Sequence, residues 1–418
     1  MSAPSGEEIS TDRTRGVVPL LLVVSTGYIA ANLGIQGFIA MLPIVQTEFA
    51  ITRTQAGLYS GFYYLSATIV AIGSGRLVDR LGPRVGLVSG AGIVGLMAIL
   101  HVLAPAFGVI VALAFVTGIG FSVITPSVSG AVIRNVFAAR RAGSMGIVHG
   151  VGGTGALAGT MVLPAIGERL GWRPVMLGAG FAAVAIAVLV AFAYDRLTPD
   201  VRPEAPTLRA AEKGAFAAAL AGLFSRRAFL ATCLMGLVFG LTVGSATGHL
   251  ALFLNQDLGF SPTLAGIGLG LFHVGGVLGQ PSWGVINDRL YRGRRHAGMY
   301  TLAVLAAAVA LLNALVISRV GVSFPVAAGV SFLLGFFLLG LPALYFTAVT
   351  EAAPAEDAGA ATGIALVFSR VGIVVGAPLF GLVADLTGAY ARSWLLLAVA
   401  AVAITGASAL VLGRRCRG

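Results

Sequence analysis

Residues 75–84 read Gly-Arg-Leu-Val-Asp-Arg-Leu-Gly-Pro-Arg and form a short charged segment between two apolar stretches. Each flanking stretch is about 20 residues long, which is the length that an α-helix needs to cross a bilayer. A related segment, Gly-Val-Ile-Asn-Asp-Arg at residues 284–289, also lies between two long apolar stretches. A charged turn that recurs between apolar helices in both halves of a chain indicates a membrane protein built from an internal repeat.

The composition of the whole chain agrees with this interpretation. Of its 418 residues 57% are apolar and only 10% are charged, which excludes an ordinary soluble domain. Twelve apolar stretches are long enough to cross a bilayer. We therefore expect an all-α membrane protein with twelve transmembrane helices in two pseudo-symmetric six-helix bundles. The expected helices are residues 17–43, 55–76, 84–104, 107–133, 143–166, 174–195, 228–254, 262–286, 298–318, 322–349, 358–384 and 391–413.

A long polar segment between the sixth and seventh apolar stretches separates the two expected bundles. It carries Pro199, Pro203 and Pro206 together with charges of both signs. The predicted organisation is a cytoplasmic N-terminal tail (1–16), a first bundle (17–195), a cytoplasmic central loop (196–227), a second bundle (228–413) and a cytoplasmic C-terminal tail (414–418).

The net charge of +11 follows from the topology of a membrane protein. With both termini in the cytoplasm, 21 of the 27 Lys and Arg residues lie on the cytoplasmic side, which is the positive-inside pattern. This pattern explains the basic clusters without a nucleic-acid partner and predicts a multi-pass protein of the cell inner (plasma) membrane. The first apolar stretch follows acidic residues and lacks a small-residue cleavage site, so we expect it to remain as a helix.

Signs of catalytic or metal chemistry are missing from the sequence. The two cysteines, Cys233 and Cys416, have neither disulfide nor metal-ligand spacing. The apolar stretches contain no acid pair, no nucleophile beside a base and no metal-binding cluster. We therefore expect neither an enzyme nor a protein with a cofactor or metal.

The internal repeat extends beyond the two charged segments. The matching residues at a constant offset of 209 are Gly57 and Gly266, Gly75 and Gly284, and Asp79 and Asp288. A second series later in each half pairs Gly155 with Gly372, Gly159 with Gly376 and Gly171 with Gly388. Transporters are often built from such repeats, because two similar bundles can rock about a central site.

Residues 75–84 closely resemble the signature loop of the major facilitator superfamily, which joins the second and third helices. Residues 284–289, followed by Gly293-Arg294-Arg295, resemble a second copy of that loop. The resemblance covers the whole chain. It implies two six-helix bundles that move by alternating access around a site near the bilayer midplane.

Five charged residues of these two loops are candidate gating residues. A carboxylate at a helix end, beside several arginines, forms a charge network that could hold the cytoplasmic side closed. Positive-inside anchoring is the alternative, but it would not need the two acids. The five residues are Asp79, Arg80, Arg84, Asp288 and Arg289.

Arg370 is the main candidate for contact with a substrate. It lies about twelve residues from the ends of the apolar run 358–384, roughly 18 Å deep, too far for easy contact with the interface. A charge at this depth costs roughly 2.5–3.5 kcal/mol and normally faces a protein interior or a water-filled path. A structural ion pair is the weaker explanation, because all acids close to the apolar stretches lie near helix ends. These acids are Glu48, Glu168, Asp257, Glu351 and Asp385. A planar guanidinium also suits a carboxylate, so we expect an anionic substrate.

The eleventh expected helix is similar to that of the oxalate/formate antiporter and monocarboxylate transporter group, in which several members carry a cationic residue near its middle. That group commonly has a second cationic residue in the eighth helix, where this chain has His273 and Gln280. The lack of a second cationic residue at this position favours a substrate with one negative charge, so we first expect a monocarboxylate. Cyanate-permease-like and other organic-anion branches stay open, because one arginine cannot separate them.

Other polar residues at membrane depth are candidates to line the same cavity. Asn32 and Gln36 share one face of the first helix with Tyr28, and His273 matches Tyr64 at the offset of 209. For most of them a structural role is about as well supported as a functional one. The full set is Tyr28, Asn32, Gln36, Tyr64, His149, His273 and Tyr345, with Tyr59 and Tyr63 as neighbours.

Together these features predict a monomeric secondary transporter for a small organic anion, working as a proton-coupled symporter or an anion exchanger. Its expected partners are the anion, protons and the lipid bilayer. A drug or metabolite exporter of the same fold, working as a proton antiporter, is the first alternative, although cationic substrates would need a buried acid. A non-transporting membrane sensor is the second alternative, since a sensor can share the same architecture.

Overall fold

A computed structural model describes residues 17–136, 138–197, 221–354 and 357–413. In these ranges the chain is almost entirely α-helical and has no β-strand. Eleven helices are long and apolar enough to cross a bilayer. A twelfth span, α4, passes the same test but is bent by 58° between Ala71 and Gly73. The expected all-α membrane architecture is confirmed.

Most spans are single helices. The ninth consists of α12 and the π-helical turn η1, and the tenth consists of α13 and α14, while the short α3 follows the first span, α2. The helix bounds are α2 Val17–Ala40, α3 Leu42–Phe49, α4 Arg53–Leu81, α5 Pro83–His101, α6 Phe107–Asn135, α7 Ala138–Leu170, α8 Trp172–Leu197, α10 Arg227–Gln256, α11 Pro262–Leu290, α12 Arg295–Leu312, the π-helical turn η1 Asn313–Ile317, α13 Phe324–Leu338, α14 Leu341–Ala352, α15 Ala358–Thr387 and α16 Tyr390–Gly413.

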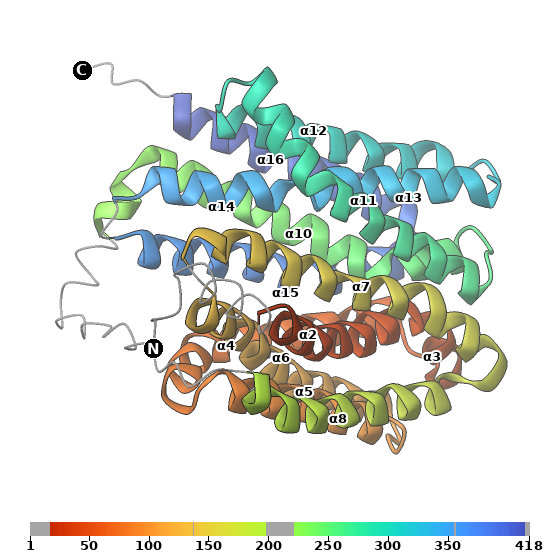
Figure 1. Cartoon of the computed structure of the whole chain (residues 1–418). Helices are drawn as coiled ribbons and strands as arrows, with labels where there is room; N and C mark the ends of the chain where they lie inside the picture. Colours follow the sequence, from red (N-terminus) through yellow and green to blue (C-terminus); the bar gives the residue numbers. More distant parts are fainter. Residues whose placement is uncertain (1–16, 137, 198–220, 355–356, 414–418) are drawn as a thin grey trace, which may run out of the picture.

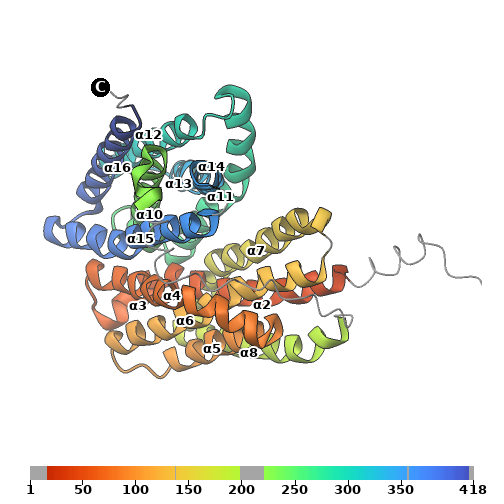
Figure 2. The same ribbon diagram turned by 90° about the vertical axis from the view of Figure 1, so that its left-hand side faces the viewer.

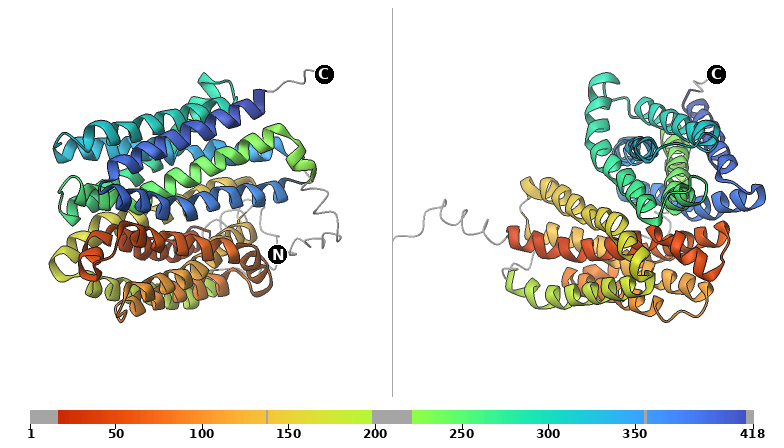
Figure 3. Two further views of the ribbon diagram at one scale, coloured as in Figure 1. Left: turned by 180° about the vertical axis from the view of Figure 1, so that it is seen from behind. Right: turned by 90° about the vertical axis from the view of Figure 1, so that its right-hand side faces the viewer.

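The helices form two bundles that lie against each other (Figure 1). Helices α2 to α8 make up the first bundle and α10 to α16 the second, and a view turned by 90° separates them (Figure 2). Two pairs of helices join the bundles, because α4 packs along α15 and α7 packs along α11. The same arrangement is seen from behind and from the other side (Figure 3).

The charged segment at residues 75–84 folds as its sequence predicts. The helix α4 ends before Gly82, whose φ of 88° is accessible because glycine has no Cβ. Pro83 then begins α5, where its fixed φ suits the first turn of a helix. At the other end of α4, Thr52 and Gln55 form a capping box. Local sequence thus sets both ends of this helix.

The second series of repeated glycines allows close packing inside each bundle. A Cβ added to Gly155 or Gly159 of α7 would lie 2.2 or 2.4 Å from a backbone oxygen of α2. A Cβ added to their repeat partners Gly372 and Gly376 of α15 would lie 2.7 Å from a backbone oxygen of α10. Each bundle therefore contains the same glycine-lined helix contact.

Candidate functional site

The guanidinium of Arg370 makes no ion pair within the part of the chain that the structure describes. Its Nη1 is buried and has no hydrogen-bond partner among the described residues. Arg370 is half-buried, and burial of Nη1 removes the water that would otherwise solvate this end of the guanidinium, so its lack of a partner is unfavourable. The side chain is therefore available to an anion.

Tyr64 lies near Arg370 on the facing bundle, and Gln36 lies beside Tyr64. Tyr64 of α4 is within electrostatic range of Arg370 and lies beside the side chain of Gln36 of α2. Gln36 is only 8% exposed, and its Oε1 has no hydrogen-bond partner in the described ranges. The structure thus brings together three of the predicted site residues, which come from three helices and both bundles.

Tyr28 and Asn32 extend this polar group along α2. Tyr28 is within electrostatic range of Tyr64, and its side chain lies beside that of Asn32. The Nδ2 of Asn32 is 3.0 Å from the backbone oxygen of Tyr28, to which it donates a hydrogen bond. The polar face that the sequence predicts for α2 therefore lies on the same side as Tyr64.

His273 of α11 is a further polar group without a partner. Its Nε2 is buried and bonds to none of the residues that the structure describes. The ring packs against Phe272, with 5.4 Å between the ring centroids. An imidazole nitrogen that is free of protein contacts can bind an anion or exchange a proton. His273 lies on a helix of the bundle interface, but no hydrogen bond in the described chain joins it to Arg370.

The remaining predicted site residues are placed differently. Tyr345 of α14 is fully buried inside the second bundle, where its hydroxyl donates to the backbone oxygen of Ala365 at 2.6 Å. Tyr59 is buried in the first bundle. Tyr63 is buried there too, but its ring centroid lies 4.8 Å from that of Tyr64 and it is also within electrostatic range of Arg370. His149 lies in α7, but its side chain is outside the described residues. A substrate contact of Tyr345 or His149 stays a prediction.

Hydrogen bonds between the bundles gather at one end of the molecule, which we call the closed end. Arg53, at the start of α4, is the centre of this network. Its backbone N–H donates to Oδ1 of Asp385 and its Nε to Oε1 of Gln256, both at 2.9 Å. Its Nη2 lies 3.6 Å from Oδ1 of Asp257, and its Cζ lies 4.9 Å from the ring centroid of Tyr390. One side chain of the first bundle thus contacts three helices of the second.

The other pair of interface helices is joined at the same end. Glu168, near the end of α7, accepts hydrogen bonds through Oε2 from the backbone N–H of Thr263, at 3.0 Å, and from its hydroxyl. Gln256, which also binds Arg53, donates to Gln46 of α3. Polar contacts therefore join both pairs of interface helices at the closed end.

Asp257 follows the last residue of α10 and belongs to this network. Burial raises the pKa of its carboxyl group, while the N–H of Tyr390, at 2.7 Å, and the guanidinium of Arg53 act in the opposite direction. The net direction is upward. Acidification therefore neutralises Asp257 before it neutralises an exposed aspartate.

The opposite ends of the same helices lie apart. A Cβ added to Gly57 of α4 would lie 2.6 Å from a backbone oxygen of α15. Gly75 comes 18 residues later, beyond the bend of α4, and an added Cβ there would meet no atom within 4 Å. In α11, Gly266 lies close to the backbone of α7 while Gly284 is again free of contacts. We call this second end the open end.

Two of the predicted gating residues form ion pairs within their own bundles. Arg84 at the start of α5 lies 3.0 Å from Asp195 of α8. Asp288 near the end of α11 pairs with Arg295 at the start of α12. Both pairs lie at the open end, so these charges do not link the bundles in this state.

The other three gating candidates also lie at the open end. The backbone oxygen of Asp79 accepts a hydrogen bond from Nη2 of Arg134 at 3.2 Å, again within the first bundle. Arg80 and Arg289 are exposed. A role of all five residues in closing this end stays a prediction.

Sequence reasoning did not single out the residues of the closed end. Glu168, Asp257 and Asp385 were expected only as acids near helix ends, and Arg53 only as an outward-facing arginine. The repeat contains a signal that could have found them. Thr263 lies 209 residues after Thr54, which is the offset of the first repeat series.

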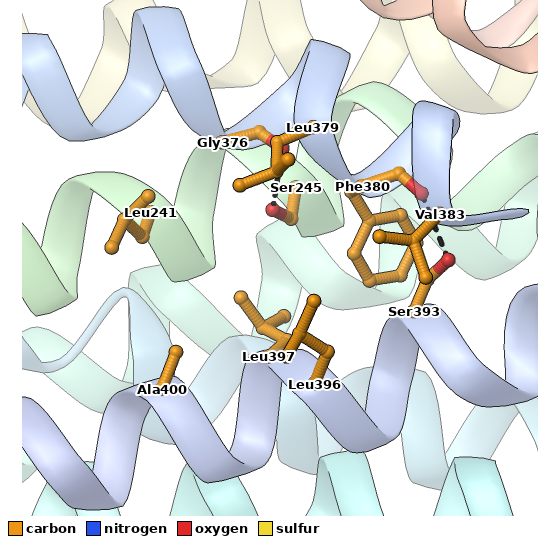
Figure 4. Close-up of a pocket in the computed structure, with 10 residues that line it drawn as sticks. All are labelled: Leu241, Ser245, Gly376, Leu379, Phe380, Val383, Ser393, Leu396, Leu397 and Ala400. Carbon is orange, nitrogen blue, oxygen red and sulfur yellow. Dashed lines mark hydrogen bonds between the residues drawn. The ribbon is translucent and has the colours of Figure 1, made fainter.

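A small cavity inside the second bundle is a poor candidate for the site. It lies between α10, α15 and α16 and has a volume of about 80 Å³ (Figure 4). Its only polar side chains are Ser245 and Ser393, whose hydroxyls donate to the backbone oxygens of Gly376 and Phe380. Its lining residues therefore offer no charge and no free hydrogen bond to an anion.

Comparison with known proteins gives a family match over almost the whole chain. The model of the Major Facilitator Superfamily matches residues 24–253 and 232–415. Among curated proteins, the chain is similar to the "Probable sulfoacetate transporter SauU" of Cupriavidus necator, with 26% identity over 361 residues and 83% of each chain covered. It is 27% identical over 380 residues to the "Membrane sensor protein UhpC" of Salmonella typhimurium, covering 84% of this chain and 82% of the relative.

A solved structure has the same fold. It is a bacterial homologue of the human lysosomal transporter Spinster, crystallised in an inward-facing and unoccupied conformation. It aligns with a TM-score of 0.76 over 96% of each chain, at 16% sequence identity. At this identity the likeness concerns the fold alone.

Proposed function

The chain belongs to the Major Facilitator Superfamily, and from this premise we propose that it is a secondary transporter of a small organic anion. The observation that carries the proposal is the buried Nη1 of Arg370, which has no hydrogen-bond partner among the described residues and belongs to a side chain within electrostatic range of Tyr64. An anion would remove the cost of the buried charge and could accept hydrogen bonds from both arms of the guanidinium. Alternating access would expose this site to each side of the membrane in turn.

We propose that the open end faces the cytoplasm. The clusters of arginine at residues 76–84 and 289–295 lie there, and the positive-inside pattern assigns them to the cytoplasmic side. The closed end, sealed by Arg53 and Asp385, would then face outward. On this assignment the structure is the inward-open state of the transport cycle.

A substrate with a carboxylate or sulfonate group fits the site best. The planar fork of an arginine pairs with either group through two parallel hydrogen bonds. The relative named as a probable sulfoacetate transporter supports an organic anion of this size. A monocarboxylate remains the first candidate, since the eighth span carries His273 where a second cationic residue is expected for a dianion, and its Nε2 has no partner among the described residues. Coupling is proposed to be proton symport or anion exchange.

A membrane sensor is the second candidate, because one of the relatives bears that name. A sensor binds its ligand but does not carry it across. Exchange of labelled anion by proteoliposomes loaded with unlabelled anion separates the two functions, because a transporter accumulates label and a sensor does not. A cation exporter receives less support, because the acids of the described helices lie near helix ends, away from Arg370.

Binding is tested directly by the thermal stability of the purified protein. We expect acetate, lactate or sulfoacetate to raise its melting temperature, whereas a lipophilic cationic dye should not. A ligand at 100 times its Kd stabilises a protein by about 2.7 kcal/mol, which is readily measured. Stabilisation by the cation and by none of the anions would refute the proposed function.

A further inference from the structure

Asp385 of the second bundle caps the first helix turn of α4 in the first bundle. The first N–H groups of a helix have no acceptor within the helix. Oδ1 of Asp385 accepts from the N–H of Arg53 at 2.9 Å, and Oδ2 accepts from the N–H of Thr54 at 2.8 Å. The hydroxyl of Thr54 also donates to Oδ2, at 2.6 Å. A helix of one bundle is thus capped by a carboxylate of the other.

Glu168 of the first bundle caps α11 of the second bundle in the same way. Its Oε2 accepts from the N–H and the hydroxyl of Thr263, which is the second residue of that helix. The first residue, Pro262, has no N–H, so Thr263 supplies the first free backbone donor. The negative charge also lies at the positive end of the helix dipole, as in the first cap.

The two caps are equivalent in the repeat. Thr54 and Thr263 are 209 residues apart, the offset of the first series. Glu168 and Asp385 are 217 residues apart, which is the offset of Gly171 and Gly388 in the second series. Each bundle therefore supplies one threonine at the start of a helix and one carboxylate near the end of another. The two contacts are reciprocal and lie at the same end of the interface.

We propose that these reciprocal caps are the latch of the closed end, and that transport requires both to open in the same step. Within one rigid-body movement α4 separates from α15 and α11 from α7, so neither cap can persist once the bundles part. When the caps break, five backbone or hydroxyl donors and two carboxylates become available to water. This inference rests on the proposed function in one respect, because it treats the opening of the closed end as a step of transport.

The test measures how often the closed end opens without substrate. Ser60 of α4 is 1% exposed and lies next to Gly248 of the second bundle. A cysteine at this position, in a Cys233→Ser and Cys416→Ser background, should react with a maleimide only when the closed end opens. We expect Glu168→Gln with Asp385→Asn to speed the labelling about tenfold, and each single variant to speed it by a smaller and similar factor.

Glu48→Gln is the matched control. Glu48 is also an acid near the closed end, but it binds Trp172 and Arg173 of its own bundle. Labelling should not change in this variant. Unchanged labelling in the double variant, or an equal rise in Glu48→Gln, would overturn the latch. If only one of the two single variants speeds the labelling, the proposal that the two caps act reciprocally is overturned.

A second set of variants distinguishes loss of the caps from a general folding defect. Thr54→Val and Thr263→Val remove the hydroxyl donors and leave both carboxylates in place, so they should speed labelling in the same direction to a smaller extent. Failure of the latch and failure of the proposed function are distinguishable, because labelling needs no anion. A protein that labels as expected but carries no anion would keep the latch and lose the proposed function.

Discussion

Replacing Arg370 by glutamine is expected to abolish anion binding while leaving the empty protein as stable as before, or more stable. Removing one partner of a buried charge pair costs about 2–5 kcal/mol of binding, which lowers affinity roughly 30-fold or more. The empty protein loses nothing comparable, because Nη1 of Arg370 has no hydrogen-bond partner among the described residues. Anion-dependent shifts of the melting temperature and uptake by proteoliposomes measure the two effects.

Arg370→Lys is the matched variant for geometry. It keeps the positive charge but replaces the planar fork with a single ammonium, so we expect weakened binding and not its complete loss. If anion binding did not weaken in either variant, Arg370 would have a structural role. If Arg370→Gln alone destabilised the empty protein by about 3–5 kcal/mol, the arginine would have to belong to a buried ion pair.

Replacing Gly57 by valine is expected to hold the closed end open. A Cβ at this position would lie 2.6 Å from a backbone oxygen of α15 and 2.9 Å from Nε2 of His249, so the bundles could not meet there. Overpacking of this kind costs about 1–3 kcal/mol, which shifts a two-state equilibrium roughly 5- to 150-fold. Transport should fall by a similar factor. Spin labels at Leu103 and Val320, which are 72% and 58% exposed beyond α5 and η1, should move apart.

Gly75→Val is the control for this prediction. It lies on the same helix, toward the other end, but a Cβ there has no neighbour within 4 Å in the present state. The distance between the two labels should therefore stay at its wild-type value. If Gly57→Val left that distance unchanged, or if Gly75→Val lengthened it equally, the contact at Gly57 would not be what closes this end.

Features imposed by the bilayer were predictable from sequence. Each span must be long and apolar whatever its tertiary contacts, so the helix count and the two bundles followed from composition and repeat. Arg370 stood out for the same reason, because a charge at that depth needs an explanation. Its neighbours Tyr64 and Gln36 followed in part from helix periodicity and from the repeat.

The contacts between the bundles were not predictable in the same way. Arg53 and Asp385 are 332 residues apart, and each has the appearance of an ordinary charge at a helix end. Their meeting depends on the relative tilt of two bundles, which differs between states of one sequence. For the same reason a closing role of Asp79 and Asp288 stays a prediction, because their end of the interface is open here.

The lone charge of Arg370 also has an electrical consequence. If the proposed function holds, the region around it carries one positive charge when empty and becomes roughly neutral when it holds a monoanion. A charge that crosses a membrane potential of 100 mV gains or loses about 2.3 kcal/mol. A potential that is negative inside would therefore retain the empty site at the cytoplasmic face and hardly affect the loaded one. The voltage-sensitive step would be the change from the inward-open to the outward-open state with an empty site. If a second anion filled the site before this change, the protein would exchange anions without that step.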